Sequence, residues 1–384
     1  MRGYQPLSLF SVDIPLQSRG HPARLLTRGI AVGAMEGFAG LLNSRVIALK
    51  HLLLTKTPQD VLVANLKAAS IPVSSDPCRT CADPCDVGHL EYPPRFGVDD
   101  AGDMLGSVDS YMRHVIISTG TADWVRHPTS EKGSLAQLIY SVSTSSAPPS
   151  ITAPSFPPRR PANGLAILNG SHACSEDETY RVLVLPDYKV VVGVASTRND
   201  AKALYDYALA PSVGRTGGTL GTEHSFRTYP LPYACVILLC SHRRVDNRCH
   251  ISSIKLEAAF RQELESHQWE VDLDLRDDEE MDPPLEEVTG SDEEKEKALV
   301  ERLRDAATGA QHGQKLALIV KVSHIGGHNY AGNVILYTPQ GPNTGTAIWY
   351  GRVSPHEVPA IVEHTIIGGK VLPELLRGGV NMIR

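Results

Sequence analysis

The sequence lacks any apolar run long enough to cross a bilayer, so no membrane span is predicted. It also lacks a surplus of positive charge: the 384 residues carry a formal net charge of −6, which does not suggest a nucleic-acid binder. The seven cysteines are too few, and odd in number, for the disulfide framework of a secreted protein. Their uneven clustering favours metal or redox chemistry in an otherwise ordinary soluble globular composition.

The N-terminal segment has very few acidic residues. Up to Pro58 it contains seven Arg and Lys residues against only Asp13 and Glu36. A basic, acid-poor and potentially amphipathic leader is typical of a mitochondrial transit peptide. We therefore predict a targeting segment over residues 1–58, with a disordered leader as the alternative.

The length of the chain indicates two domains, because 384 residues exceed one ordinary core. Residues 211–222 are rich in glycine and lie in a predicted linker, residues 211–230. The domains then cover residues 59–210 and 231–384. A proline-rich stretch, residues 141–161, reads as a long loop within the first domain.

Alternating and continuous apolar patterns predict an α/β fold in both domains. In the first, we expect strands at residues 114–119, 164–169, 180–186 and 188–195, and helices at 134–142 and 197–209. In the second, we expect strands at 233–239, 269–275, 316–322, 333–337 and 347–353, and helices at 252–266, 293–307 and 355–366. Ser252 is a possible cap for the first of these helices.

The order of elements in the second domain resembles a thioredoxin-like layout with one extra strand. The first domain repeats a looser version of that order, so an internal duplication is plausible. An acid-rich run begins at Asp272, with thirteen Asp and Glu up to Glu296 against Arg276 and Lys295. We interpret residues 276–292 as a solvated insertion that loops out of the fold.

Two pairs of candidate metal ligands each follow a buried strand. Cys240 and Cys249 come after the strand at 233–239, and His324 and His328 come after the strand at 316–322. Open α/β sheets place their ligands beyond the carboxyl ends of strands, so the four side chains are expected to converge. Two thiolates and two imidazoles can hold a zinc ion or an iron–sulfur cluster.

The spacing favours an iron–sulfur cluster, which is larger than one zinc ion. Eight residues between the two cysteines are too many for a zinc knuckle. The simpler alternative is a core thiol at a strand end and two ordinary loop histidines. His242 and His250 are competing ligands that we place in the second coordination sphere or in solvent. We interpret Cys235 as inert core, Cys174 as having no role, and three further histidines as surface residues: His312, His356 and His364.

A second group of thiols, Cys78, Cys81 and Cys85, lies between the leader and the first domain. A C-x-x-C pair such as Cys78 and Cys81 can be a redox dithiol or part of a metal knuckle. The sequence leaves three alternatives open here: a thiol–disulfide oxidoreductase, an accessory metal site, and reduced thiols on a mobile segment.

At the ligand residues the sequence resembles the sucrase/ferredoxin-like family. The run from Ser323 through His324, Gly326-Gly327, His328 and Asn333 looks like the family signature, and Cys240-x8-Cys249 matches its cysteine half. The family's tail pattern is also present, as Trp349–Val353, Pro355-His356 and Arg377-Gly-Gly379. The likeness is strong from about Tyr233 to the end of the chain.

This resemblance implies a 2Fe–2S cluster held by Cys240, Cys249, His324 and His328. It further implies a thioredoxin-like ferredoxin in the C-terminal domain and a degenerate thioredoxin-like domain before it. The expected function is electron transfer in mitochondrial redox quality control, in the matrix or the intermembrane space. The expected partners are redox proteins and the iron–sulfur assembly machinery. A zinc-stabilised, non-catalytic scaffold and a Cys78/Cys81 oxidoreductase are the alternatives.

Overall fold

A computed structural model of the protein describes residues 58–146, 164–218, 220–221, 224–277, 280–339 and 345–382. The predicted targeting segment lies outside these residues, apart from Pro58, and so does most of the predicted loop at 141–161. Among the described residues, every helix is too short or too polar to span a membrane.

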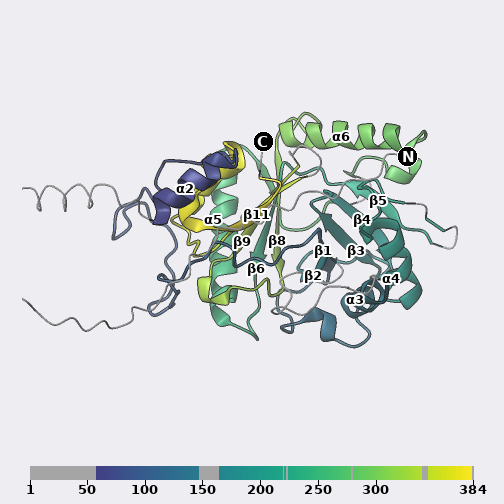
Figure 1. The fold of residues 1–384 in the computed structure, drawn as a ribbon, viewed down its shortest axis with the longest axis horizontal. Helices are drawn as coiled ribbons and strands as arrows, with labels where there is room; N and C mark the ends of the chain where they lie inside the picture. The colour runs from purple at the N-terminus through teal and green to yellow at the C-terminus, as the bar shows by residue number, and fades with distance from the viewer. Residues whose placement is uncertain are drawn as a thin grey trace, which may run out of the picture.

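The chain folds into two halves of mixed helices and strands (Figure 1). The first half contains α2 (Pro58–Ala68), β1 (Arg113–Ser118), η1 (Pro128–Ser130), α3 (Leu135–Ser146), β2 (Leu165–Gly170), β3 (Tyr180–Leu185), β4 (Lys189–Val194), α4 (Arg198–Leu204), the π-helical turn η2 (Tyr205–Leu209) and β5 (Arg227–Pro230). The six predicted elements of this half are present, with shifts of a few residues at their ends.

The second half begins with β6 (Cys235–Cys240), α5 (Asn247–Ser266), β7 (Glu270–Asp272), η4 (Leu285–Glu287), α6 (Asp292–Thr308) and β8 (Leu316–Val322). It continues with η5 (His328–Tyr330), β9 (Val334–Thr338), β10 (Thr346–Tyr350), α7 (Val358–Ala360), the π-helical η6 (Ile361–Ile367), η7 (Pro373–Leu375) and β11 (Leu376–Val380). α6 begins at a capping box formed by Ser291 and Glu294, and it ends at left-handed Gly309.

The strands of the two halves follow the same pairing pattern. In the first half β1 is parallel to β2 and antiparallel to β3, and β3, β4 and β5 continue antiparallel. In the second half β6 is parallel to β8 and antiparallel to β9, and β9, β10 and β11 continue antiparallel. The order β11-β10-β9-β6-β8-β2-β1-β3-β4-β5 places the matching strands in mirrored positions. This correspondence supports the predicted internal duplication.

The sheet folds back on itself where the two halves meet. The described strands of the two halves pair at Gly170 of β2 and Val322 of β8, next to backbone hydrogen bonds from Ser171 to Lys321 and from Ser323 to Asn169. His114 of β1 nevertheless lies 2.8 Å, Nδ1 to Oη, from Tyr337 of β9, four places away in the strand order. Across a flat sheet that separation would be about 19 Å, so the half-sheets must face each other. The buried core between them includes Leu183, Leu238 and Tyr337.

Helices cover the outer faces of the two half-sheets. α3 and α4 pack on the first half, around Ile139 and Leu204, and α5, with the α7–η6 segment, packs on the second, around Phe260 and Ile361. Figure 1 shows α2 beside the C-terminal elements, where Val73 pairs with Val371. The protein is therefore an α/β fold, as the sequence predicted. Its described strands form one large sheet, and the two halves share a core.

Two segments differ from their sequence interpretation. The end of the predicted linker forms β5, which pairs with β4. The acid-rich insertion does not simply loop out: Leu285 and Met281 are buried in the shared core, and the Glu286 carboxylate accepts a 3.0 Å hydrogen bond from the Thr228 amide. The segment packs against the core because of these two apolar side chains, despite its high negative charge.

Candidate metal centre

The ends of β6 and β8 place two of the predicted ligands at one edge of the sheet. Cys240 is the last residue of β6 and is opposite Val322 of β8 in register. His324 follows Val322 by two residues, so both side chains lie beyond the carboxyl ends of neighbouring parallel strands. Cys240 is buried, and its amide donates a 3.2 Å hydrogen bond to the Asn333 carbonyl.

Cys249 lies in the first turn of helix α5 rather than in a loop. The helix begins at Asn247, because the Asp246 side chain caps it by accepting a hydrogen bond from the Arg248 amide. The predicted start at Ser252 is wrong: the Ser252 hydroxyl instead donates to the Cys249 carbonyl inside the helix. The helix N-terminus brings partial positive charge to the Cys249 thiol, which favours a thiolate.

The loop that carries His324 and His328 is shaped by two adjacent glycines. Gly326 and Gly327 both have left-handed backbones, with φ of 81° and 67°. A Cβ on Gly327 would lie 2.4 Å from Nη2 of the buried Arg377, whereas one on Gly326 would meet no atom within 4 Å. Gly327 is therefore required by the close approach of an arginine.

The donor atoms of this region form a connected set. Cys240, His242 and His324 each present a ligand atom within 4.8 Å of the others. The Cys249 thiol contacts Cys240, and the rings of His324 and His328 lie 5.7 Å apart, centroid to centroid. The structure thus brings all four predicted ligands to one region, with His242 among them.

His242 is buried, so its predicted alternative position in solvent is wrong. Its Nε2 lies 3.0 Å from Nδ1 of His324, and its own Nδ1 has no hydrogen-bond partner among the described residues. An imidazole in this position can fix the tautomer of His324, as outer-sphere groups commonly do for metal-bound histidines. The sequence could have indicated that His242 lies at the site, because it is only two residues from Cys240.

The pKa values of the thiols and imidazoles at this site favour a bound cation. Contact with Cys240, and then burial, raise the pKa of the Cys249 thiol, so the two thiols resist ionising together without a cation between them. Burial, followed by the neighbouring His242, lowers the pKa of His324 to about 4, and burial and His324 lower that of His328. Neutral imidazoles keep a lone pair for a metal. This donor set fits either a zinc ion or a 2Fe–2S cluster.

The first half contains a counterpart of this region without its chemistry. Ser118 ends β1 opposite Gly170, as Cys240 ends β6 opposite Val322, and His172 follows Gly170 as His324 follows Val322. The buried His172 ring is within hydrogen-bond distance of the Arg181 carbonyl, 2.9 Å from Nε2. A serine in place of the thiolate leaves the first half without a matching ligand pair.

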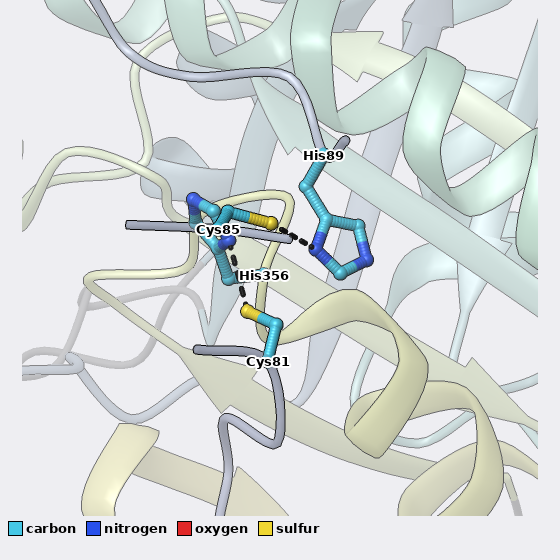
Figure 2. Close-up of side chains that lie close together, drawn as sticks. All are labelled: Cys81, Cys85, His89 and His356. Atoms are coloured by element: carbon cyan, nitrogen blue, oxygen red, sulfur yellow. Dashed lines mark hydrogen bonds between the residues drawn. The ribbon is translucent and has the colours of Figure 1, made fainter. Parts of the chain in front are cut away.

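The N-terminal thiols Cys78, Cys81 and Cys85 lie in different surroundings. Cys78 is buried in the core of the second half, and burial, then Glu374, raise the pKa of its thiol to about 12. Cys81 instead lies beside His356, and Cys85 beside His89 (Figure 2). Desolvation would raise the pKa of Cys85, but hydrogen bonds from His89 and Val87 outweigh it and lower the value to about 7. This arrangement gives little support to a Cys78/Cys81 oxidoreductase.

One family model and several curated proteins match parts of this chain. A family model described as sucrase/ferredoxin-like matches residues 104–378. "Altered inheritance of mitochondria protein 32" of Debaryomyces hansenii is 59% identical over 59 residues, covering 15% of this chain and 21% of that protein. Its namesake in Clavispora lusitaniae is 53% identical over 57 residues, covering 15% and 19%. "Actin patches distal protein 1" of Saccharomyces cerevisiae is 31% identical over 131 residues, covering 34% and 29%.

These alignments span less than a third of each relative's length, and the names of the first two indicate a mitochondrial link. No solved structure matches the chain significantly. The family match contains Cys240, Cys249, His324 and His328, begins after Cys81 and Cys85, and covers well over half of the sequence. On that extent of match, the chain belongs to the sucrase/ferredoxin-like family.

Proposed function

We propose that this protein is a 2Fe–2S electron carrier that acts in mitochondrial redox quality control. Cys240 and Cys249 would hold one iron as thiolates, and His324 and His328 would hold the other. The observation that carries the proposal is that Cys240 and His324 lie together at the carboxyl edge of β6 and β8, in a chain of a ferredoxin-like family. Cys249 contacts Cys240, and the His328 ring lies near that of His324.

When bound, such a cluster takes up and releases a single electron, and two imidazole ligands raise its potential above that of an all-cysteine cluster. The protein supplies the environment. The buried Arg377 guanidinium lies against Gly327 in the ligand loop, and its charge favours ionised Cys240 and Cys249. Added positive charge near the site favours the reduced, more negative state.

We further propose that each half is a thioredoxin-like unit. In the second half the order β7-β8-β6-β9-β10 has three parallel strands followed by two antiparallel ones, with β11 added at the edge. The repeated pairing of β1 to β5 supports a degenerate copy in the first half.

A single metal ion is the second candidate, because one observation favours it. Cys240, His242 and His324 are compact enough to surround one ion, and Cys249 contacts Cys240. A zinc ion held there would stabilise the fold without carrying electrons. The two candidates differ in which histidine is essential: His328 for the cluster and His242 for the single ion.

The decisive experiment is the visible absorption spectrum of full-length protein purified without oxygen, with its iron, inorganic sulfide and zinc contents. A charge-transfer spectrum with equimolar iron and sulfide is expected. A colourless protein with zinc at this site would overturn the proposal.

Variants of the ligands refine the test. Cys240→Ser, Cys249→Ser and His328→Ala should lose the chromophore, because a hydroxyl or a methyl group cannot replace the iron ligand. Cys235→Ser, a buried thiol in β6 outside the donor set, and His242→Gln should retain it. Loss with His242→Gln but not with His328→Ala would assign the site to a single ion.

Mitochondrial placement, in the matrix or the intermembrane space, also belongs to this proposal, as do partnerships with redox proteins and the iron–sulfur assembly machinery. The names of the relatives and the basic, acid-poor residues 1–58 support it. Fractionation of cells expressing the full chain, with and without residues 1–57, tests the targeting. Recovery of both forms in the cytosol alone would contradict it.

A further inference from the structure

A second cluster of cysteines and histidines lies apart from the β6–β8 site. Cys81, Cys85 and His89 come from residues 74–112, which contain no helix or strand and which we call the N-terminal strap. His356 comes from the second half, just before α7. In Figure 2 the Cys81 thiol points to the His356 ring and the Cys85 thiol to the His89 ring. His356 was predicted to be a surface residue, but it is only 4% exposed.

The four ligand atoms have the spacing of one tetrahedral site. All lie within 4.8 Å of one another. Cys81 Sγ is 3.3 Å from His356 Nδ1, and Cys85 Sγ is 3.4 Å from His89 Nδ1. A tetrahedral zinc ion, with Zn–S of about 2.3 Å and Zn–N of about 2.0 Å, holds its sulfur and nitrogen ligands roughly 3.6 Å apart. Small side-chain shifts would therefore admit the ion.

The surroundings of His356 favour binding through Nδ1. Its other nitrogen, Nε2, lies 3.1 Å from a carboxylate oxygen of Glu91. The pair lacks hydrogen-bond geometry in this structure. A carboxylate that accepts a hydrogen bond from the second nitrogen of a ligating histidine would fix the tautomer and make the ligand more basic. The rings of His89 and His356 pack edge to face with centroids 5.2 Å apart.

The position of the cluster suggests what a metal would do. The strap runs across the second half and contacts its ligand loop. The Asp99 amide donates to the Asn329 carbonyl (2.9 Å), the Tyr92 hydroxyl to the Val353 carbonyl (2.7 Å), and Arg352 to the Gly102 carbonyl (2.7 Å). Long segments without secondary structure order only when something fixes them. A metal joining the strap to His356 would supply such a cross-link.

We propose that Cys81, Cys85, His89 and His356 bind one structural zinc ion, which staples the N-terminal strap to the second half. Two thiolates and two imidazoles in a compact tetrahedron are a zinc donor set. Four protein ligands leave no open position, so the site is structural rather than catalytic. The site is independent of the β6–β8 site and shares no ligand with it.

The test begins with full-length protein, purified with its native metals, in which zinc and iron are measured in the same sample. About one zinc ion per chain is expected in the wild type. X-ray absorption at the zinc edge should show a mixed sulfur and nitrogen shell at the distances given above. Zinc with only oxygen and nitrogen neighbours, or no zinc at all, would overturn the proposal, as would a Cys81–Cys85 disulfide in the native protein.

Variants then assign the ligands. Cys85→Ser and His89→Gln should lose most of the zinc and leave the iron content unchanged, which separates this site from the proposed cluster. Cys174→Ser, which removes a partly exposed thiol of the first half, is the matched control and should retain zinc. Cys78→Ala, which removes a thiol three residues from Cys81, should also retain it. Loss of zinc in either control, or its retention in Cys85→Ser and His89→Gln, would refute the ligand set.

Limited trypsin digestion tests the stapling. Arg79 and Arg95 are exposed residues of the strap on either side of the three N-terminal ligands. Cleavage after these arginines should accelerate at least tenfold in Cys85→Ser, and in wild type stripped by a zinc chelator, relative to Cys174→Ser. Equal cleavage rates would show that the strap does not depend on the metal.

Discussion

Arg377 and Asn333 are joined in the protein interior by a 2.6 Å hydrogen bond from Nη1 to Oδ1. The Asn333 side-chain amide donates in turn to the Gly327 carbonyl at 2.9 Å, and the Asn333 carbonyl accepts from the Cys240 amide. Arg377 also donates through Nε to the Ser107 hydroxyl at 3.0 Å. One arginine thereby connects β11, the end of β6, the histidine loop and the N-terminal strap.

The first prediction is that Arg377→Lys destabilises the protein. Arg377 uses two different nitrogens, Nε and Nη1, to reach Ser107 and Asn333. A lysine has one nitrogen and no rigid fork, so it should not reproduce both hydrogen bonds in good geometry. The free energy of unfolding should fall by about 2 kcal/mol, measured by urea denaturation. Arg227→Lys, which alters an exposed pair with Glu287, should change it by less than about 0.5 kcal/mol. Equal effects would contradict the connecting role of Arg377.

The two loop glycines give the second prediction. Gly326→Ala and Gly327→Ala both place a Cβ on a left-handed backbone, which costs about 1–2 kcal/mol in either case. Only the Gly327 variant also collides with Arg377. We expect Gly327→Ala to lose the metal cofactor and Gly326→Ala to keep it, as judged by absorption and metal content of the folded protein. If the two variants behave alike, Arg377 does not shape the loop.

Several features of the site followed from local sequence. The continuous apolar run of β6 and that of β8 predicted buried strands. The two strands pair in parallel, and their register puts Cys240 and His324 at the same edge of the sheet. The start of α5 was missed because Asp246 and Ser252 are both good caps, and polar Asn247 and Arg248 hide the helical pattern. The sequence alone does not say which of the two side chains accepts a hydrogen bond from the first turn of the helix.

Other features depend on contacts between distant residues. β5 and β11 are short and contain Arg, Pro or Gly, so they become strands through pairing with β4 and β10 rather than through intrinsic preference. His356 is 275 positions from Cys81, and no local pattern joins them. The shared core between the half-sheets likewise arises from tertiary packing, which the two-domain interpretation could not anticipate.

The acid-rich segment gives the third prediction, which reverses the expectation drawn from its charge. Leu285 is 2% exposed and packs in the core shared by both halves, so Leu285→Ala should lower the free energy of unfolding by about 3 kcal/mol. Leu273→Ala is the matched control, because that side chain is 39% exposed and should cost less than about 1 kcal/mol. Denaturation curves of both variants measure the two free energies of unfolding. If Leu285→Ala costs no more than Leu273→Ala, the segment is a solvated loop as the sequence suggested.

The last prediction concerns acid stability and the His114 ring at the centre of the shared core. His114 stacks on Tyr111, lies near Trp349, and contacts the Tyr337 hydroxyl. Burial lowers the pKa of His114 to about 3, whereas an unfolded histidine titrates near 6.5. Between these values the unfolded chain binds a proton that the folded protein does not, so stability must fall as the pH drops from about 6.5 towards 3.

From pH 7 to pH 5 this one residue should cost about 2 kcal/mol. His114→Phe keeps an aromatic ring in place but cannot bind a proton. It should be about 1 kcal/mol less stable than wild type at pH 8, because one buried hydrogen bond is lost. Its loss of stability between pH 7 and pH 5 should nevertheless be smaller by about 2 kcal/mol. Urea titrations at both pH values make the comparison. His267→Gln, at the exposed C-terminal cap of α5, is the control for removing an imidazole. A decline in His114→Phe as steep as that of the wild type would show that His114 is protonated in the folded protein or does not control its acid stability.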